Sequence, residues 1–191
     1  MGFFDVLRGK RQLKKPVPTD RLFAMSTAQV TMELELELKS DGKAGIVFQP
    51  LATADFEGIV RDMEEVVRGA GSDTGTTIEI TDDDFGYRWM VLVDPDFEDL
   101  VVGLNAVSTA LEAGGYGDRI LAAVFAFRDE AGKPVYWIYN YKRGAFYPFV
   151  PAGGEQRRDN ERELRLKAQI GAELPIEADL ERWFPLWGIP I

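Results

Sequence analysis

Three consecutive carboxylates, Asp82, Asp83 and Asp84, form the densest group of potential metal ligands in the sequence. Carboxylate oxygens are the ligands that Mg²⁺ and Ca²⁺ prefer, so the triplet could belong to a metal-dependent enzyme. The surrounding sequence lacks the longer loop with a terminal Glu that an EF-hand requires. Aspartates followed by Gly86 are also typical of a hairpin turn, and this second interpretation is favoured.

Aromatic and basic residues are interleaved in the stretch YNYKRGAFYPFVPAGGEQRRDNERELRLK. Arginine beside aromatic rings, or near the start of a helix, can bind phosphate or carboxylate. A candidate anion or partner surface therefore comprises Lys142, Arg143, Arg157 and Arg158. Alternatively, the aromatic residues fill the last strand, and Arg157 and Arg158 pair with Asp159, Glu161 and Glu163 on a solvated helix. The spacing alone favours this alternative.

The opening segment, MGFFDVLRGKRQLKK, combines a short apolar cluster with a basic run. On a helical wheel its apolar residues share one side, with Asp5 opposite. The first fifteen residues carry a charge of +4, whereas the whole chain carries −10 and the remaining 176 residues carry −14. This basic arm could bind an anionic bilayer, dock on a partner or simply begin the domain. The candidate contact residues are Phe3, Phe4, Leu7, Arg8, Lys10 and Arg11.

The composition excludes several classes of chemistry. The chain has no histidine and no cysteine, which excludes Ser-His-Asp and Cys-His catalysis and zinc-thiolate sites. Neither the dinucleotide-binding nor the P-loop glycine motif occurs. A body this acidic repels polyphosphate, so we expect no nucleic-acid partner. We also expect no cofactor, no metal site and no catalytic residues.

The length and patterning predict an N-terminal arm, residues 1–18, followed by a single α+β domain, residues 19–191. No run approaches the roughly 20 apolar residues that a membrane-spanning helix needs. We therefore expect a cytoplasmic protein.

Hydrophobic periodicity predicts three successive ββα units. After a short helix that starts at Asp20, residues 30–39 alternate between apolar and polar and predict a strand. A tight turn at Ser40–Lys43 would join this strand to residues 44–48. The other predicted elements are a helix at 55–69, a hairpin at 76–81 and 87–93, a helix at 96–112, a hairpin at 120–127 and 135–141, and a helix between Gly154 and Gly171. This order predicts an antiparallel sheet built from successive hairpins, with helices packed on one face.

The closing segment DLERWFPLWGIPI is too apolar for a free tail. Its large side chains either pack back onto the domain, which is the favoured interpretation, or form a partner-binding patch. The residues concerned are Trp183, Phe184, Leu186 and Trp187.

Several segments resemble, in order and spacing, the PspA-associated protein family called PspAB. These are MGFFDVLRGK, DRLFAMSTAQVT, FGYRWMVL, GGYGDRILAAVFAF, YNYKRGAFYPFVP, RDNERELRLKAQIG and ERWFPLWGIPI. The resemblance spans nearly the whole chain, and YKRGAFYPFVP and RWFPLWG are its most specific parts. It implies association with PspA, the membrane-remodelling protein of the phage-shock response. It implies no catalytic activity and supplies no site residues.

The residues and the resemblance together predict a non-enzymatic accessory protein of the PspA membrane-stress response. Its expected partners are a PspA-like protein and an anionic membrane surface, reached from the cytoplasm at the inner membrane face. The alternative is a small-molecule or anion-binding regulatory domain with its ligand on the surface of Lys142, Arg143 and Arg157.

Overall fold

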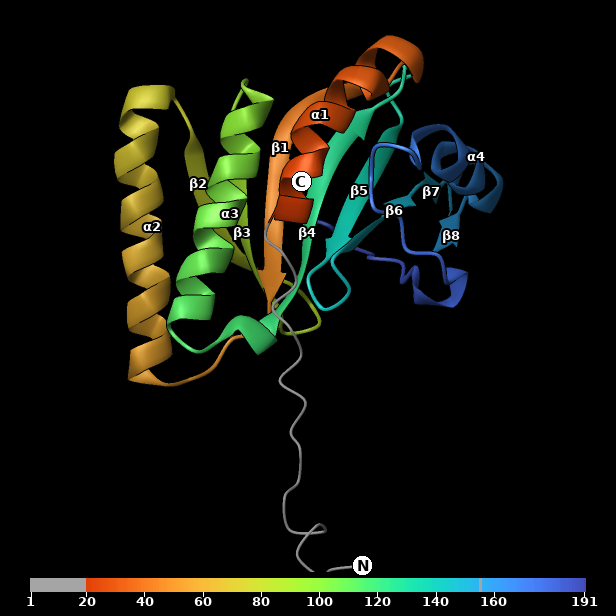
Figure 1. The fold of residues 1–191 in the computed structure, drawn as a ribbon. Coiled ribbons are helices and arrows are strands. Elements are labelled where there is room, and N and C mark those ends of the chain that lie inside the picture. The colour runs from red at the N-terminus through yellow and green to blue at the C-terminus, as the bar shows by residue number, and fades with distance from the viewer. Residues whose placement is uncertain (1–19, 155) are drawn as a thin grey trace, which may run out of the picture.

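The computed structural model describes residues 20–154 and 156–191 (Figure 1). Its helices are α1 (Asp20–Glu35), α2 (Ala54–Thr74), α3 (Phe97–Ala113) and α4 (Asn160–Ile170), with short 3-10 turns η1 (Gly117–Arg119) and η2 (Leu180–Arg182). Its strands are β1 (Lys39–Phe48), β2 (Thr77–Asp82), β3 (Arg88–Val93), β4 (Ile120–Arg128), β5 (Pro134–Asn140), β6 (Ala145–Phe149), β7 (Pro151–Ala152) and β8 (Arg157–Arg158). The predicted α+β class is confirmed.

The strands β1 to β6 form one antiparallel sheet in the order β2-β3-β1-β4-β5-β6. The predicted hairpins β2–β3 and β4–β5 are both present. A further strand, β6, follows β5 through a turn at Lys142–Gly144, so Phe146 and Phe149 lie in a separate strand at the sheet edge. The chain therefore does not adopt the predicted threefold ββα order.

The first predicted hairpin is wrong, because residues 30–35 continue helix α1. Leu and Glu are good helix formers, and the buried residues Leu22, Met25, Ala28 and Met32 recur at helical spacing. Val30 and Leu34, which a strand would bury, are 52% and 79% exposed.

The predicted tight turn lies inside a single strand. Residues 40–44 form an irregularity in β1, where the register against β4 shifts between Ser40 and Ala44. Gly42 has a φ of +66°, a conformation that suits glycine. The chain therefore bends within β1 and does not reverse there.

Helices α3 and α4 lie close to where the sequence predicts them, and each begins at an aspartate cap. The Asp96 side chain accepts a hydrogen bond from the backbone N–H of Glu98 at the start of α3, and Asp159 accepts one from Arg162 at the start of α4. Helix α2 runs to Thr74, beyond the end predicted at residue 69.

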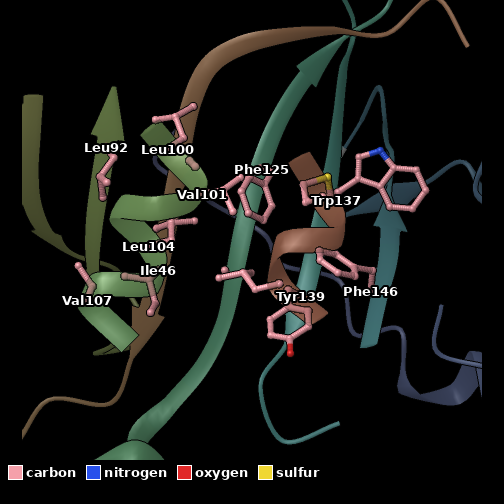
Figure 2. Packing of buried hydrophobic residues seen from close by; sticks show 14 of the residues in the cluster. Ile46, Leu92, Leu100, Val101, Leu104, Val107, Phe125, Trp137, Tyr139 and Phe146 are labelled. Atoms are coloured by element: carbon pink, nitrogen blue, oxygen red, sulfur yellow. The ribbon is translucent and has the colours of Figure 1, made fainter. Parts of the chain in front are cut away.

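Helices α1, α2 and α3 cover one face of the sheet, side by side in the order α2, α3, α1 (Figure 1). Figure 2 shows Leu100, Leu104 and Val107 of α3 against Ile46 and Leu92 of the sheet. The helix α4 packs beside the edge strand β6. No helix among the described residues is long and apolar enough to cross a membrane.

The C-terminal segment, residues 176–191, covers the opposite face of the sheet. Trp183 is 4% exposed and packs in a cluster that includes Val124, Ile138 and Tyr147. Leu186 and Trp187 are partly buried against the same cluster, whereas Phe184 is 59% exposed. The predicted packing of this segment onto the domain is therefore confirmed for three of its four large residues.

Candidate binding surfaces

The N-terminal contact residues predicted from the sequence, Phe3, Phe4, Leu7, Arg8, Lys10 and Arg11, lie outside the described residues. The structure does show where the described part of the chain begins. Arg21, in the first turn of α1, donates a hydrogen bond from Nη1 to the carbonyl oxygen of Gly144 at 3.2 Å. The first described residues therefore lie beside the turn between β5 and β6.

Lys142 and Arg143 lie in this β5–β6 turn. The turn is held by Asn140, whose side-chain oxygen accepts from the Lys142 N–H and whose carbonyl accepts from Gly144. Arg143 Nε lies 2.8 Å from Glu177 Oε2, and the Glu177 side chain is only 6% exposed. This hydrogen bond lowers the pKa of Glu177 below its ordinary value of 4.5. Arg143 thus fastens the C-terminal segment to the turn.

Arg158, on β8, links three parts of the fold. Its guanidinium lies 2.7 Å from the carboxylate of Glu163 on α4, whose side chain is 2% exposed. It also donates to the carbonyl oxygen of Trp183 and lies over the ring of Phe149. Burial raises the pKa of Glu163, and the hydrogen bond from Arg158 opposes that rise.

The four predicted basic residues fall into two separate pairs. Lys142 and Arg143 precede strand β6, whereas Arg157 and Arg158 follow it, and a five-residue strand is roughly 16 Å long. Arg143 and Arg158 are engaged with buried carboxylates. The side chains of Lys142 and Arg157 are exposed and form no hydrogen bond or ion pair with the other described residues. An anion that contacted all four would have to span the strand.

The Glu177 interaction predicts a specific pH dependence of stability. Because its pKa is lowered in the folded state, Glu177 contributes stability above its unfolded pKa, and that contribution is lost as pH falls through the folded value. Between about pH 5 and pH 3, the unfolding free energy of Glu177→Gln should therefore fall less steeply than that of the wild type. Urea denaturation at several pH values measures this effect. Glu181→Gln, at an exposed position nearby, is the control, and an equally steep loss in the Glu177 variant would contradict the prediction.

The aspartate triplet spans the end of β2 and the start of the turn that leads to β3. Asp82 pairs with Arg88 at 2.8 Å, which lowers the pKa of Asp82. Asp83 accepts from the indole Nε1 of Trp89 at 3.0 Å and from two backbone N–H groups of the turn. Within the described ranges, no three acidic residues are grouped so that they could hold a metal ion. The favoured turn interpretation therefore agrees with the geometry.

An apolar groove between α2 and α3 was missed in the sequence analysis. It has a volume of about 330 Å³ and is lined mainly by apolar side chains. Its lining includes Met63 and Val66 of α2 and Ala106, Ala110 and Ala113 of α3. Val66 is 65% exposed. A signal existed in the sequence, since α3 carries no charged residue from Leu100 to Leu111 and is therefore uncharged on its outer side as well.

A second hollow lies beside the C-terminal half of α1. It has a volume of about 750 Å³ and is largely polar. Its lining includes Val30 and the acidic residues Glu33, Asp41, Asp96 and Glu98. The two hollows differ in character, because the first is apolar and the second is acidic.

A comparison with protein-family models tests the resemblance to the PspAB family. The family model described as PspA associated protein B matches residues 1–191, the whole chain. The chain belongs to the PspAB family. No curated protein and no solved structure gives a match. The PspAB family name states an association with PspA.

Proposed function

We propose that this PspAB-family chain is a non-enzymatic accessory protein of the PspA membrane-stress response. It acts in the cytoplasm by contact with PspA and by peripheral contact with the anionic inner face of the membrane. The observation that carries the proposal is the family match, which extends over the entire chain and includes the arm. Association with PspA follows from the family, and the membrane contact is inferred from the arm.

The membrane contact rests on the composition of residues 1–15. Phe3, Phe4 and Leu7 supply apolar surface, and five basic residues against one acidic residue give the segment a charge of +4. A basic residue near an anionic membrane surface contributes about 1 kcal/mol. The apolar cluster is short, and Gly9 weakens a helix beyond it, so the contact is weak and reversible. Simultaneous contact with PspA would strengthen it by raising the effective concentration.

The alternative role, binding of a small anion at Lys142, Arg143 and Arg157, has less support from the geometry. Arg143 is already paired with the buried carboxylate of Glu177. Arg157 lies beyond the other end of β6, away from the turn that holds Lys142 and Arg143. A single small ligand would therefore meet few free cationic groups.

Vesicle sedimentation with the full chain tests the membrane contact. Phe3→Asp with Phe4→Asp should reduce binding to phosphatidylglycerol-containing vesicles at least about tenfold, because burying each Phe contributes about 1.5–3 kcal/mol. The control, Lys14→Ala with Lys15→Ala, changes the net charge equally but keeps both aromatic rings. It should cause a smaller loss, which disappears at higher salt.

Retention of the chain by immobilised PspA tests the protein contact separately. We expect wild-type protein to be retained with or without vesicles. If PspA retains nothing and vesicles bind nothing, the proposed function is wrong. If the double aspartate variant binds vesicles as well as wild type does, the arm is not the membrane contact.

A further inference from the structure

The α2–α3 groove is an apolar surface between two acidic helices. Helix α2 contains six acidic and two basic residues, and α3 contains three acidic residues and no basic ones. Asp62 lines the groove, and Glu65 is exposed next to Val66. An occupant that suits this surface would combine a few large apolar side chains with positive charge. Residues 1–15 of the arm have this composition.

Helix α3 alone separates the start of α1 from the groove (Figure 1). The pKa of Tyr139 is raised to about 12, mainly by burial, and it responds to the charges of both Arg21 and Glu112. Arg21, in the first turn of α1, and Glu112, in the last turn of α3, therefore both lie near Tyr139, and the two helices pack side by side. Residues Ala113 and Gly114, which follow Glu112, line the groove. Figure 1 shows the beginning of α1 beside α3, with α2 on the far side of α3.

The length of the arm is sufficient. Packed helices are separated by about 8–10 Å, so the groove lies within roughly 20 Å of the start of α1. The segment of residues 8–19 spans up to roughly 40 Å when extended. Residues 3–7 can therefore reach the groove without any change in the described fold.

We infer that, when neither membrane nor PspA is bound, the arm docks in the α2–α3 groove of its own chain. Phe3, Phe4 and Leu7 fill the space above Ala106 and Ala110, where small side chains leave room. Arg8, Lys10 and Arg11 face the acidic residues of α2. This inference rests on the proposed function, because it describes how the same arm is held back before it meets its target.

If the arm docks in the groove, the groove and the membrane compete for the same residues. The arm can bind a bilayer only in the fraction of molecules in which it has left the groove, so the apparent affinity is reduced by that fraction. A membrane or a PspA contact that captures the free arm shifts the equilibrium toward release.

Disulfide trapping tests the docking directly, since the chain contains no cysteine. We would compare Phe4→Cys/Val66→Cys with Phe4→Cys/Val30→Cys under mild oxidation. Both valines are on exposed helix surfaces, at 65% and 52% exposure, and Val30 lines the acidic hollow instead of the groove. The intramolecular disulfide should form at least about tenfold faster in the Val66 pair, because docking raises the effective concentration.

Equal rates, or a faster reaction with position 30, would overturn the inference. Disulfide-linked dimers that predominate over the intramolecular product would assign the groove to a second copy and would also overturn it. If a cysteine placed in the groove is protected from thiol modification only after PspA is added, the groove binds PspA and the inference is wrong.

Vesicle binding separates this inference from the proposed function. Val66→Asn with Ala106→Gln should weaken docking and raise affinity for anionic vesicles severalfold, whereas Thr27→Gln with Val30→Asn should leave affinity unchanged. If the groove variant binds like wild type while the double aspartate arm variant loses binding, the inference fails and the proposed function stands. If no variant binds vesicles or PspA but the Val66 disulfide still forms preferentially, the proposed function fails and the docking stands.

Discussion

Replacing Trp183 with alanine should lower the free energy of unfolding by about 3–5 kcal/mol, the usual cost of removing a large buried aromatic side chain. The Trp183 side chain is 4% exposed, lies against Tyr147 at a ring distance of 6.2 Å, and donates from Nε1 to the carbonyl of Glu177. All of these interactions are lost in the variant. Urea denaturation followed by far-UV circular dichroism measures the change.

The adjacent aromatic residue provides a matched control. Phe184 is 59% exposed. Its backbone carbonyl accepts a hydrogen bond from the Tyr147 hydroxyl, and an alanine at this position retains that carbonyl. Phe184→Ala should therefore change stability by less than about 0.5 kcal/mol. Similar effects of the two substitutions would mean that the C-terminal segment is not held on the sheet as described.

Arg158→Ala should cost about 3 kcal/mol, because it leaves the buried Glu163 carboxylate without its charged partner. The two side chains are 18% and 2% exposed, so water cannot fully replace the lost interaction. The variant also loses the hydrogen bond to the Trp183 carbonyl and the contact with the Phe149 ring. The same denaturation measurement applies.

The control for Arg158 is an arginine on the neighbouring helix with an exposed partner. Arg165 pairs with Glu161, and their side chains are 65% and 84% exposed. Arg165→Ala should therefore cost less than about 0.5 kcal/mol. A double-mutant cycle between Arg158 and Glu163 should show coupling of at least about 0.5 kcal/mol, because these two side chains form the ion pair. Additive effects would show that this ion pair does not contribute to stability.

These expected effects bear on function, because they assign most of the C-terminal aromatic residues to the core. Trp183 and Trp187 contact the sheet face, the latter through Phe149 at a ring distance of 5.0 Å. They are therefore poor candidates for a partner-binding patch. The arm and the α2–α3 groove are the surfaces that we propose for binding.

Local signals were sufficient to predict much of the fold from the sequence. The β2–β3 and β4–β5 hairpins have Asp and Gly in their turns, and Gly86 and Gly132 adopt positive φ there. Helices α3 and α4 start at aspartate caps. Each of these signals acts between residues that are close in the chain, so no knowledge of the packing was needed.

Helix α1 shows where local signals are insufficient. Residues 30–35 fit both a period of two and a helix, because Leu and Glu suit a helix while the alternation suits a strand. The choice is made by the sheet, whose apolar face is covered when Met25, Ala28 and Met32 pack against it. The groove was missed for a related reason, because it exists only where two helices distant in sequence lie side by side.

The sequence by itself determined the α+β class, two hairpins, the helices α3 and α4, the basic character of the arm and the resemblance to the PspAB family. The sequence also favoured a pairing of Arg158 with an acidic residue of the next helix, which the structure contains, but only the tertiary structure decided that Arg143 is engaged as well. Arg143 pairs with Glu177, 34 residues away, and Arg158 also donates to the carbonyl of Trp183, 25 residues away. A buried carboxylate needs a charged partner, and that partner is the basic residue that folding brings nearest to it in space.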